Sequence, residues 1–125
     1  MHVSKLRISS DSTGKLRVLA QKAGLTPNLL CRMAMMVSFE VGPLNQMRSD
    51  LEDGQEFNAY TLFGPYQPIF LDMLRYVEMK GRGEELSDDD LLERLKHHID
   101  RGVRQLAVRI KTPVDAALLL SGEVD

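Results

Sequence analysis

The sequence lacks tryptophan and has only three tyrosines and four phenylalanines among its 125 residues. A surface that stacks unpaired bases on aromatic rings is therefore not expected. Its single cysteine, Cys31, cannot form an intramolecular disulfide, and nothing indicates an oxidising compartment. No stretch approaches the roughly 18 apolar residues of a membrane span, and no apolar signal region is evident. We therefore expect a cytoplasmic protein without a membrane partner.

Motifs for catalysis, cofactors and metals are also missing. There is no Gly-rich phosphate loop and no nucleophile motif, so we predict no enzyme, no cofactor and no metal site. His97 and His98 are adjacent and cannot share a metal from a regular helix. The acidic run of residues 88–90 is typical of a helix start, which favours negative charge. Cys31 is interpreted as a buried structural thiol, because a reactive one needs exposure and a lowered pKa.

Charge is unevenly distributed along the chain. The first 38 residues carry six Lys or Arg and one acid, Asp11, whereas residues 39–93 carry four bases and thirteen acids. The formal net charge of −2 and the pI near 5.9 hide this polarity. They exclude a DNA-binding surface that covers the whole molecule, so any binding must use a local patch.

The first expected element is a strand. Residues 3–9 alternate, with Leu6 and Ile8 on one side and Lys5, Arg7 and Ser9 on the other, which predicts a half-buried strand. A lone strand leaves its backbone groups unpaired. We therefore expect this strand to pair with another chain.

Two helices are expected next, over residues 11–23 and 27–39. Leu16 and Leu19 follow helical spacing, and Gly24 suits the left-handed position after a helix. Thr26 and Pro27 form a strong start signal, because threonine caps and proline fits the first helical position. The second helix is apolar on nearly all sides, which favours a subunit interface.

The remaining sequence predicts an acidic loop segment, residues 40–66, followed by a helical extension, residues 67–125. Residues 60–63 are interpreted as a short strand or packed loop, and residues 81–83 as a flexible joint. Helices are expected over about residues 68–79, after a cap at Ser87, and after Thr112 and Pro113. The fold class is mainly α, in one domain of residues 1–125 whose first unit is residues 1–39.

The strand and two helices resemble the ribbon-helix-helix arrangement, in which two chains pair their N-terminal strands. A closer resemblance lies in residues 24–28, in Leu30, Cys31, Arg32, Ala34 and Ser38, and in residues 61–64. These segments resemble the DndE family, the small subunit of the bacterial DNA phosphorothioation system. The resemblance implies a ribbon-helix-helix variant with extra C-terminal helices and a homotetramer. It also implies binding to duplex DNA, with a preference for nicks, and sulfur transfer carried out with partner subunits.

The candidate DNA contacts are chosen from charge and geometry. Lys and Arg gain affinity for DNA by releasing condensed counterions, and a helix start suits a phosphate. A second basic cluster, residues 94–111, is interpreted as a solvated helix face that could serve as a secondary contact. The predicted DNA-binding residues are Lys5, Arg7, Lys15, Arg17, Lys22, Thr26, Asn28 and Arg32. Arg32 is expected to meet a carboxylate or a phosphate, because an unpaired arginine is costly to bury.

Three other hypotheses remain open from the sequence. A ribbon-helix-helix repressor or antitoxin would read an operator through Lys5, Arg7 and Ser9 in the major groove. An enzyme, such as a nuclease or a protein that handles persulfide on Cys31, is the second. An assembly scaffold built on the acidic middle segment is the third.

Overall fold

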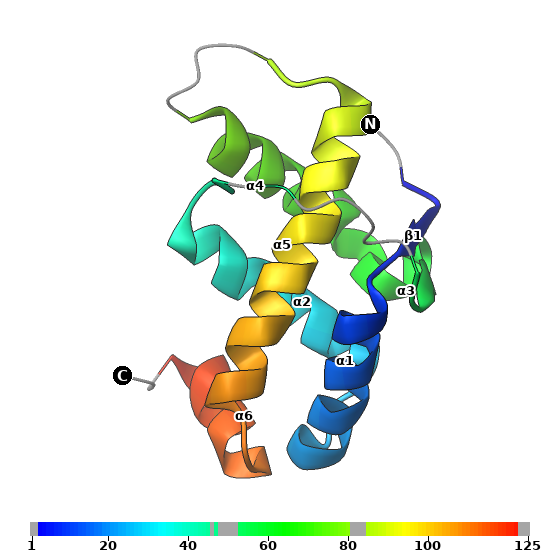
Figure 1. The fold of residues 1–125 in the computed structure, drawn as a ribbon. Coiled ribbons are helices and arrows are strands. Elements are labelled where there is room, and N and C mark those ends of the chain that lie inside the picture. Colours follow the sequence, from blue (N-terminus) through cyan, green and yellow to red (C-terminus); the bar gives the residue numbers. More distant parts are fainter. Residues whose placement is uncertain (1–2, 46, 48–52, 81–84, 123–125) are drawn as a thin grey trace.

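The longest described helix, α5 (Asp88–Arg109), runs along the middle of the molecule, with the other helices around it (Figure 1). The computed structural model describes residues 3–45, 47, 53–80 and 85–122. The other elements, in chain order, are β1 (Lys5–Arg7), α1 (Ser10–Ala23), α2 (Pro27–Val41), β2 (Glu56–Asn58), α3 (Ala59–Phe63), the 3₁₀ turn η1 (Gly64–Tyr66), α4 (Gln67–Met79) and α6 (Pro113–Ser121). The predicted mainly helical fold, with a short strand before two helices, is confirmed.

Both α1 and α2 begin at a side-chain cap, and the cap of α2 is the Thr26 that the sequence predicts. Ser9 Oγ accepts a hydrogen bond from Ser12 N over 3.0 Å, and Thr26 Oγ1 accepts one from Leu29 N over 3.3 Å. Each satisfies a backbone donor that the helix leaves unpaired. Gly24 ends α1 with φ of 70°, in the left-handed region that a side chain would strain. Local sequence signals thus place both helices correctly.

The core forms where α2 crosses α5. A Cβ at Gly102 would overlap the carbonyl group of Ala34, so the crossing requires glycine. Leu30 on α2 and Ile99 and Val103 on α5 are fully buried around it. This close approach holds the two helices that carry most of the polar groups described below.

Strand β1 pairs with β2 of the same chain, in antiparallel register, with Leu6 opposite Phe57. The expectation of a partner strand from another chain is therefore wrong. The physical reason is that the acidic segment returns to β1 and satisfies its backbone groups, for example through Ile8 N and Gln55 O, 3.0 Å apart. Leu6 and Phe57 are both buried, which fixes the register.

The expectation of a strand or loop over residues 60–63 is also wrong. These residues belong to α3, which begins at a cap where Asn58 Oδ1 accepts from Tyr60 N over 2.8 Å. The predicted helices further on are confirmed as α4, α5 and α6, with Ser87 and Thr112 as caps. The expected joint at residues 81–83 lies outside the described residues.

Candidate nucleic-acid interface

Helix α1 presents cationic side chains on the side opposite the core. Leu16 and Leu19 are buried, while Arg17 and Lys22 are exposed and Lys15 is half-buried. Lys15 Nζ binds the Asp11 carboxylate at 2.6 Å, an i, i+4 pair on the helix surface. Arg17 and Lys22 form no ion pair with any residue of the described ranges. These two cations are therefore available to an external anion.

The cations of β1 lie beside the start of α1. Arg7 Nη1 donates to the carbonyl oxygen of Gly54 over 2.9 Å, and its guanidinium lies 3.7 Å from Glu56. A shallow hollow lined by Arg17 also includes Gly54, so both arginines flank the same turn. Lys5 is exposed and has no ion pair within the described part of the chain. The structure thus brings Arg7 of β1 and Arg17 of α1 to one turn.

Ser9 does not project outward with Lys5 and Arg7, although the alternation predicts that it does. It is buried, and its Oγ donates to Asp100 Oδ1 over 3.1 Å, as does Ser12 Oγ over 2.9 Å. Asp100 on α5 thereby tethers the start of α1. Because Ser9 is the cap of α1 and a hydrogen bond donor in the core, it is unavailable for the base contact that the repressor hypothesis requires.

Of the predicted contacts on α2, Thr26 and Arg32 already make hydrogen bonds within the chain. Thr26 uses its hydroxyl to cap the helix, and Asn28 is half-buried. The carboxylate expected beside Arg32 is not found among the described residues. Instead, Arg32 Nε donates to the carbonyl oxygen of Leu62 over 2.6 Å and Nη2 to that of Thr61 over 3.3 Å, because α3 presents unpaired carbonyls there. Arg32 therefore joins α2 to α3, apart from the α1 cations.

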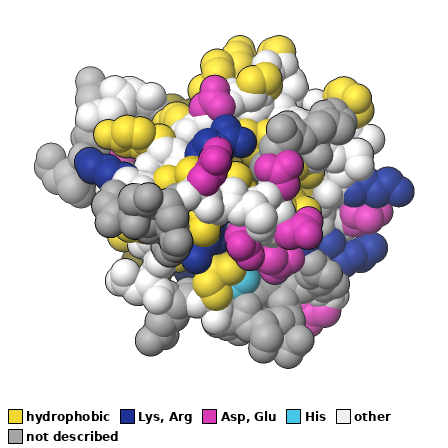
Figure 2. All heavy atoms as spheres, turned by 90° about the horizontal axis from the view of Figure 1, so that it is seen from above, with side chains coloured by type: hydrophobic (Ala, Val, Ile, Leu, Met, Phe, Trp, Pro, Cys, Tyr) yellow, Lys and Arg dark blue, Asp and Glu magenta, His cyan; other side chains and the backbone are white. Residues whose placement is uncertain are grey.

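Three consecutive acidic residues lie at the opposite end of the molecule from the C-terminal end of α1 (Figure 1). Asp88, Asp89 and Asp90 occupy the first turn of α5, where the helix dipole favours negative charge. Figure 2 views the molecule from this end and shows Asp and Glu side chains there, with Lys and Arg side chains among them.

The second basic cluster is not simply a solvated helix face. Lys96 is buried, and Arg94 and Arg101 are half-buried. Arg101 donates from Nη2 to the carbonyl oxygens of Ser38 at 2.8 Å and Gly42 at 2.5 Å. The interpretation fails for Arg94 and Arg101 because they lie on the sides of α5 that face α4 and α2. It fails for Lys96 because that residue is buried and paired with Glu93 of its own helix. Arg104, Arg109 and Lys111 remain exposed.

A buried polar network connects α2, α4 and α5. His98 Nδ1 lies 2.8 Å from Ser38 Oγ, and its Nε2 lies 2.8 Å from Glu78 Oε2. Glu78 also accepts from Leu44 N over 3.0 Å and from Arg94 Nη1 over 2.5 Å. Ser38, Glu78 and His98 are all 0% exposed. No local signal in the sequence indicates this network, because its members are far apart in the chain.

The direction of each hydrogen bond follows from its donors. The ionised Glu78 carboxylate can only accept, so His98 carries a proton on Nε2 and donates it to Glu78. In neutral His98, Nδ1 then accepts from Ser38 Oγ, which itself accepts from Arg101 Nε over 2.8 Å. Burial lowers the pKa of His98, although Glu78 opposes this shift. Burial raises the pKa of Glu78, but the hydrogen bonds from His98, Leu44 and Arg94 outweigh it and lower the pKa to about 2.

This network has the residue types of a Ser–His–acid triad but lacks access to a substrate. The serine oxygen lies inside the core, where it accepts a hydrogen bond from Arg101. A nucleophile must reach a reacting atom directly. The arrangement therefore acts as a clamp between three helices.

Cys31 is likewise buried, and burial raises its pKa to about 12. A thiol with so high a pKa carries almost no thiolate at neutral pH, and the thiolate is the reactive form. This agrees with the structural role expected for it. Within the described residues, no group of three or more His, Cys, Asp or Glu is placed to hold a metal ion, and no helix is long and apolar enough to cross a membrane.

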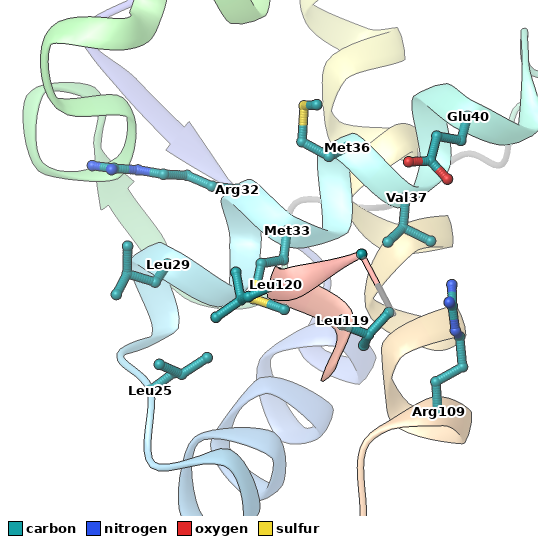
Figure 3. A pocket seen from close by; sticks show the side chains of 11 residues that line it. Leu25, Leu29, Arg32, Met33, Met36, Val37, Glu40, Arg109, Leu119 and Leu120 are labelled. Carbon is teal, nitrogen blue, oxygen red and sulfur yellow. The ribbon is translucent and has the colours of Figure 1, made fainter. Parts of the chain in front are cut away.

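An apolar groove of about 650 Å³ lies between α2 and α6. Leu25, Leu29, Met33, Met36, Val37, Leu119 and Leu120 line it, and Figure 3 shows Glu40 and Arg109 at one end of it. Met36 is 41% exposed and Leu120 is 63% exposed. Exposed apolar surface of this kind is typical of an interaction site.

Comparison with known proteins decides the family. The family model for the DNA sulphur modification protein DndE matches residues 5–113. The chain belongs to the DndE family. A search of curated proteins finds no match. This membership supports the expected role as a subunit of a phosphorothioation system and not as its catalytic enzyme.

Solved DndE structures share the fold. The crystal structure of DndE from Escherichia coli B7A, involved in DNA phosphorothioation modification, has a TM-score of 0.70 at 21% identity, covering 85% of this chain and 98% of that one. A glycine-to-lysine mutant of DndE, involved in DNA phosphorothioation, has a TM-score of 0.64 at 18% identity, covering 84% and 97%. The arrangement of β1, β2 and the helices is therefore that of DndE.

Proposed function

We propose that this chain is a noncatalytic, DNA-binding subunit of a DNA phosphorothioation complex, and that it holds the duplex backbone with a preference for nicked DNA. The single observation that carries the proposal is the exposed cationic face of α1 in a member of the DndE family. Such a system acts on DNA, so the protein works in the cytoplasm with the other subunits of the complex.

The charge distribution supports binding through phosphates. Arg17 and Lys22 are exposed and have no ion pair with described residues, and Arg7 flanks the same turn as Arg17. Each phosphate contact releases condensed counterions, which supplies affinity without base readout. The acidic first turn of α5 lies at the opposite end of the molecule from the C-terminal end of α1 (Figure 1), where its charge repels the polyanion.

A preference for nicks has a physical basis. Intact duplex resists bending over a site of this size, whereas a nick removes the continuity of one strand and lowers that resistance. A nicked duplex can therefore bend to follow a cationic protein surface at a smaller deformation cost. Thr26 and Asn28 at the start of α2 and Lys5 on β1 are the remaining contact residues of this proposal.

Assembly into a homotetramer multiplies the cationic face. The groove between α2 and α6 supports a second copy of this chain as its occupant, because it is apolar and carries both Glu40 and Arg109 at its rim. In a two-fold symmetric interface, Glu40 of one copy can pair with Arg109 of the other copy. Met36→Glu places a charge in the groove and is expected to shift the mass measured by light scattering toward the monomer; an unchanged mass contradicts this assignment.

The experiment that tests DNA binding uses labelled duplexes of one sequence, intact or with a single nick, titrated at several salt concentrations. We expect tighter binding to the nicked form and a log–log salt slope of about −0.9 per phosphate contact. The double variant Arg17→Glu, Lys22→Glu should bind at least about tenfold more weakly, since it replaces two attractions by repulsions. Circular dichroism confirms that each variant is folded.

The matched control is Arg75→Glu, Lys80→Glu on and beside α4, which makes the same change in net charge. It should retain most of the affinity. Equal reductions in both double variants would mean that net charge alone matters and would remove α1 as the interface. If wild-type protein binds neither the intact nor the nicked duplex at low salt concentration, the proposal is wrong.

A further inference from the structure

Gly14 is unlike the other glycines that the structure describes. Four of those adopt positive φ, and in two others an added Cβ would lie under 3.0 Å from neighbouring atoms. These six are Gly24, Gly42, Gly64 and Gly122, and Gly54 and Gly102. Gly14 lies inside α1 with nothing within 4 Å of an added Cβ. No contact within the described chain requires glycine at this position.

Glycine is nevertheless costly there, because a helix interior favours alanine over glycine. The residue is exposed, so packing does not compensate for this cost. A missing side chain on an exposed helix face does allow another molecule to approach the backbone closely. The described part of the chain therefore gives no reason for Gly14, and an external ligand would give one.

Two shallow hollows meet at this position. One, of about 440 Å³, includes Lys15 and Lys22. The other, of about 480 Å³, includes Arg17. Both are lined by Ser10 and Gly14. Gly14 thus forms a low saddle across α1, with cations on both sides of it.

The acids in these hollows already have partners. Asp11 is held by Lys15, and Asp53 accepts hydrogen bonds from Ser10 N at 2.8 Å and Ser10 Oγ at 3.1 Å. Arg17 and Lys22 remain unpaired among the described residues. Arg17 on one side of the saddle and Lys22 on the other are consequently the charged groups open to a ligand.

Resting on the DNA-binding function proposed above, we infer that a phosphate strand of DNA crosses α1 directly over Gly14, between Lys22 and Arg17. Because Gly14 has no Cβ, the DNA strand lies close enough to α1 for the cations on both sides to reach its phosphates. Such a contact depends on an absent side chain, so the positions of the charged residues alone do not reveal it.

A protein helix is the other occupant that a glycine saddle could receive. Inside this chain, Gly102 serves that purpose, but its neighbours Ile99, Val103 and Leu106 are apolar and fully buried. The neighbours of Gly14 include charged Lys15 and Arg17, whose burial under a helix would be costly. The flanking charges therefore favour a charged, hydrated ligand.

The test is a size series, Gly14→Ala and Gly14→Leu, titrated with the same nicked duplex. Both substitutions should raise Tm, since the helix gains propensity and no described atom lies within 4 Å of the new Cβ. DNA affinity should fall with side-chain size, by about tenfold for leucine, which corresponds to one charge-assisted hydrogen bond to a phosphate. The salt slope should become shallower by about 0.9 for each phosphate that the variant no longer neutralises. Val108→Leu on the exposed face of α5 is the control and should leave affinity unchanged.

The outcomes separate this inference from the proposed function. If wild-type protein binds DNA and Gly14→Leu binds equally well, the saddle is not the crossing point, although DNA binding stands. If Gly14→Leu changes the mass in light scattering and leaves DNA affinity intact, a helix of another copy crosses there, which also overturns the inference. If wild-type protein does not bind DNA, both proposals fail together.

Discussion

Two regions of the molecule use the same kinds of charged residue in opposite ways. On α1, Arg17 and Lys22 extend into solvent without partners among the described residues. Between α2, α4 and α5, the charges of Glu78 and Arg101 are enclosed and hydrogen-bonded. Charge in water costs little and can be offered to a ligand, whereas charge in the core must be satisfied by the protein. Position, and not residue type, thus decides whether a cation is available for binding.

The largest effect should come from removing the centre of the buried network. Glu78→Ala leaves Arg94 and His98 without their acceptor inside the protein, which is expected to cost about 3–5 kcal/mol of unfolding free energy. Urea denaturation measures this loss. Asp72→Ala, on the exposed side of the same helix, is the control and should cost less than about 0.5 kcal/mol. If both variants lose similar amounts of unfolding free energy, burial does not explain the difference between the two regions.

Acidification should weaken the same network by a smaller amount. The folded pKa of His98 lies below its ordinary value of 6.5, because burial opposes the charged form and Arg94 and Arg101 face it alongside Glu78. Its contribution is therefore present above pH 6.5 and is lost as the pH falls. The pKa of Glu78 is lowered from 4.5 to about 2, so its contribution is present above 4.5 and is lost as the pH falls toward 2.

Urea midpoints measured from neutral pH down to about pH 3 follow both steps, since each group binds more protons when unfolded. We expect stability to fall in two stages, and His98→Asn should remove the first of them. Stability that rises between pH 7 and pH 5 would contradict the neutral, Nε2-protonated state assigned to His98.

Local signals predicted the helices well and long-range contacts poorly. Thr26 and Thr112 were found as caps because each acts on residues three positions away. The pairing of Leu6 with Phe57 depends on where the acidic segment returns, and no nearby residue encodes that return. The exposure of Arg17 followed from its helical phase, since Leu16 and Leu19 define the buried side.

The candidate site shows the same division. The sequence predicted a cationic α1 face, which the structure confirms as exposed at Arg17 and Lys22. It also predicted a carboxylate or phosphate beside Arg32 on the second helix, whereas the structure pairs the Arg32 guanidinium with the carbonyl oxygens of α3. Arg101 was interpreted as solvated because a helical wheel cannot show which neighbour covers a position. Periodicity therefore shows on which side of its helix a charged residue lies. It does not show which neighbouring helix covers that side in the fold.

The smallest effect is expected at an exposed ion pair on the surface of α1. Lys15 and Asp11 form a salt bridge with both side chains substantially exposed, at 36% and 51%. Lys15→Ala should change the unfolding free energy by only about 0.3–0.5 kcal/mol, because water screens the pair and ordering two side chains opposes it. The same substitution frees Asp11 beside the saddle and should weaken DNA binding more than it weakens the fold. A stability loss of several kcal/mol would mean that α1 is held by its surface charges, and the separation into a binding face and a structural clamp would fail.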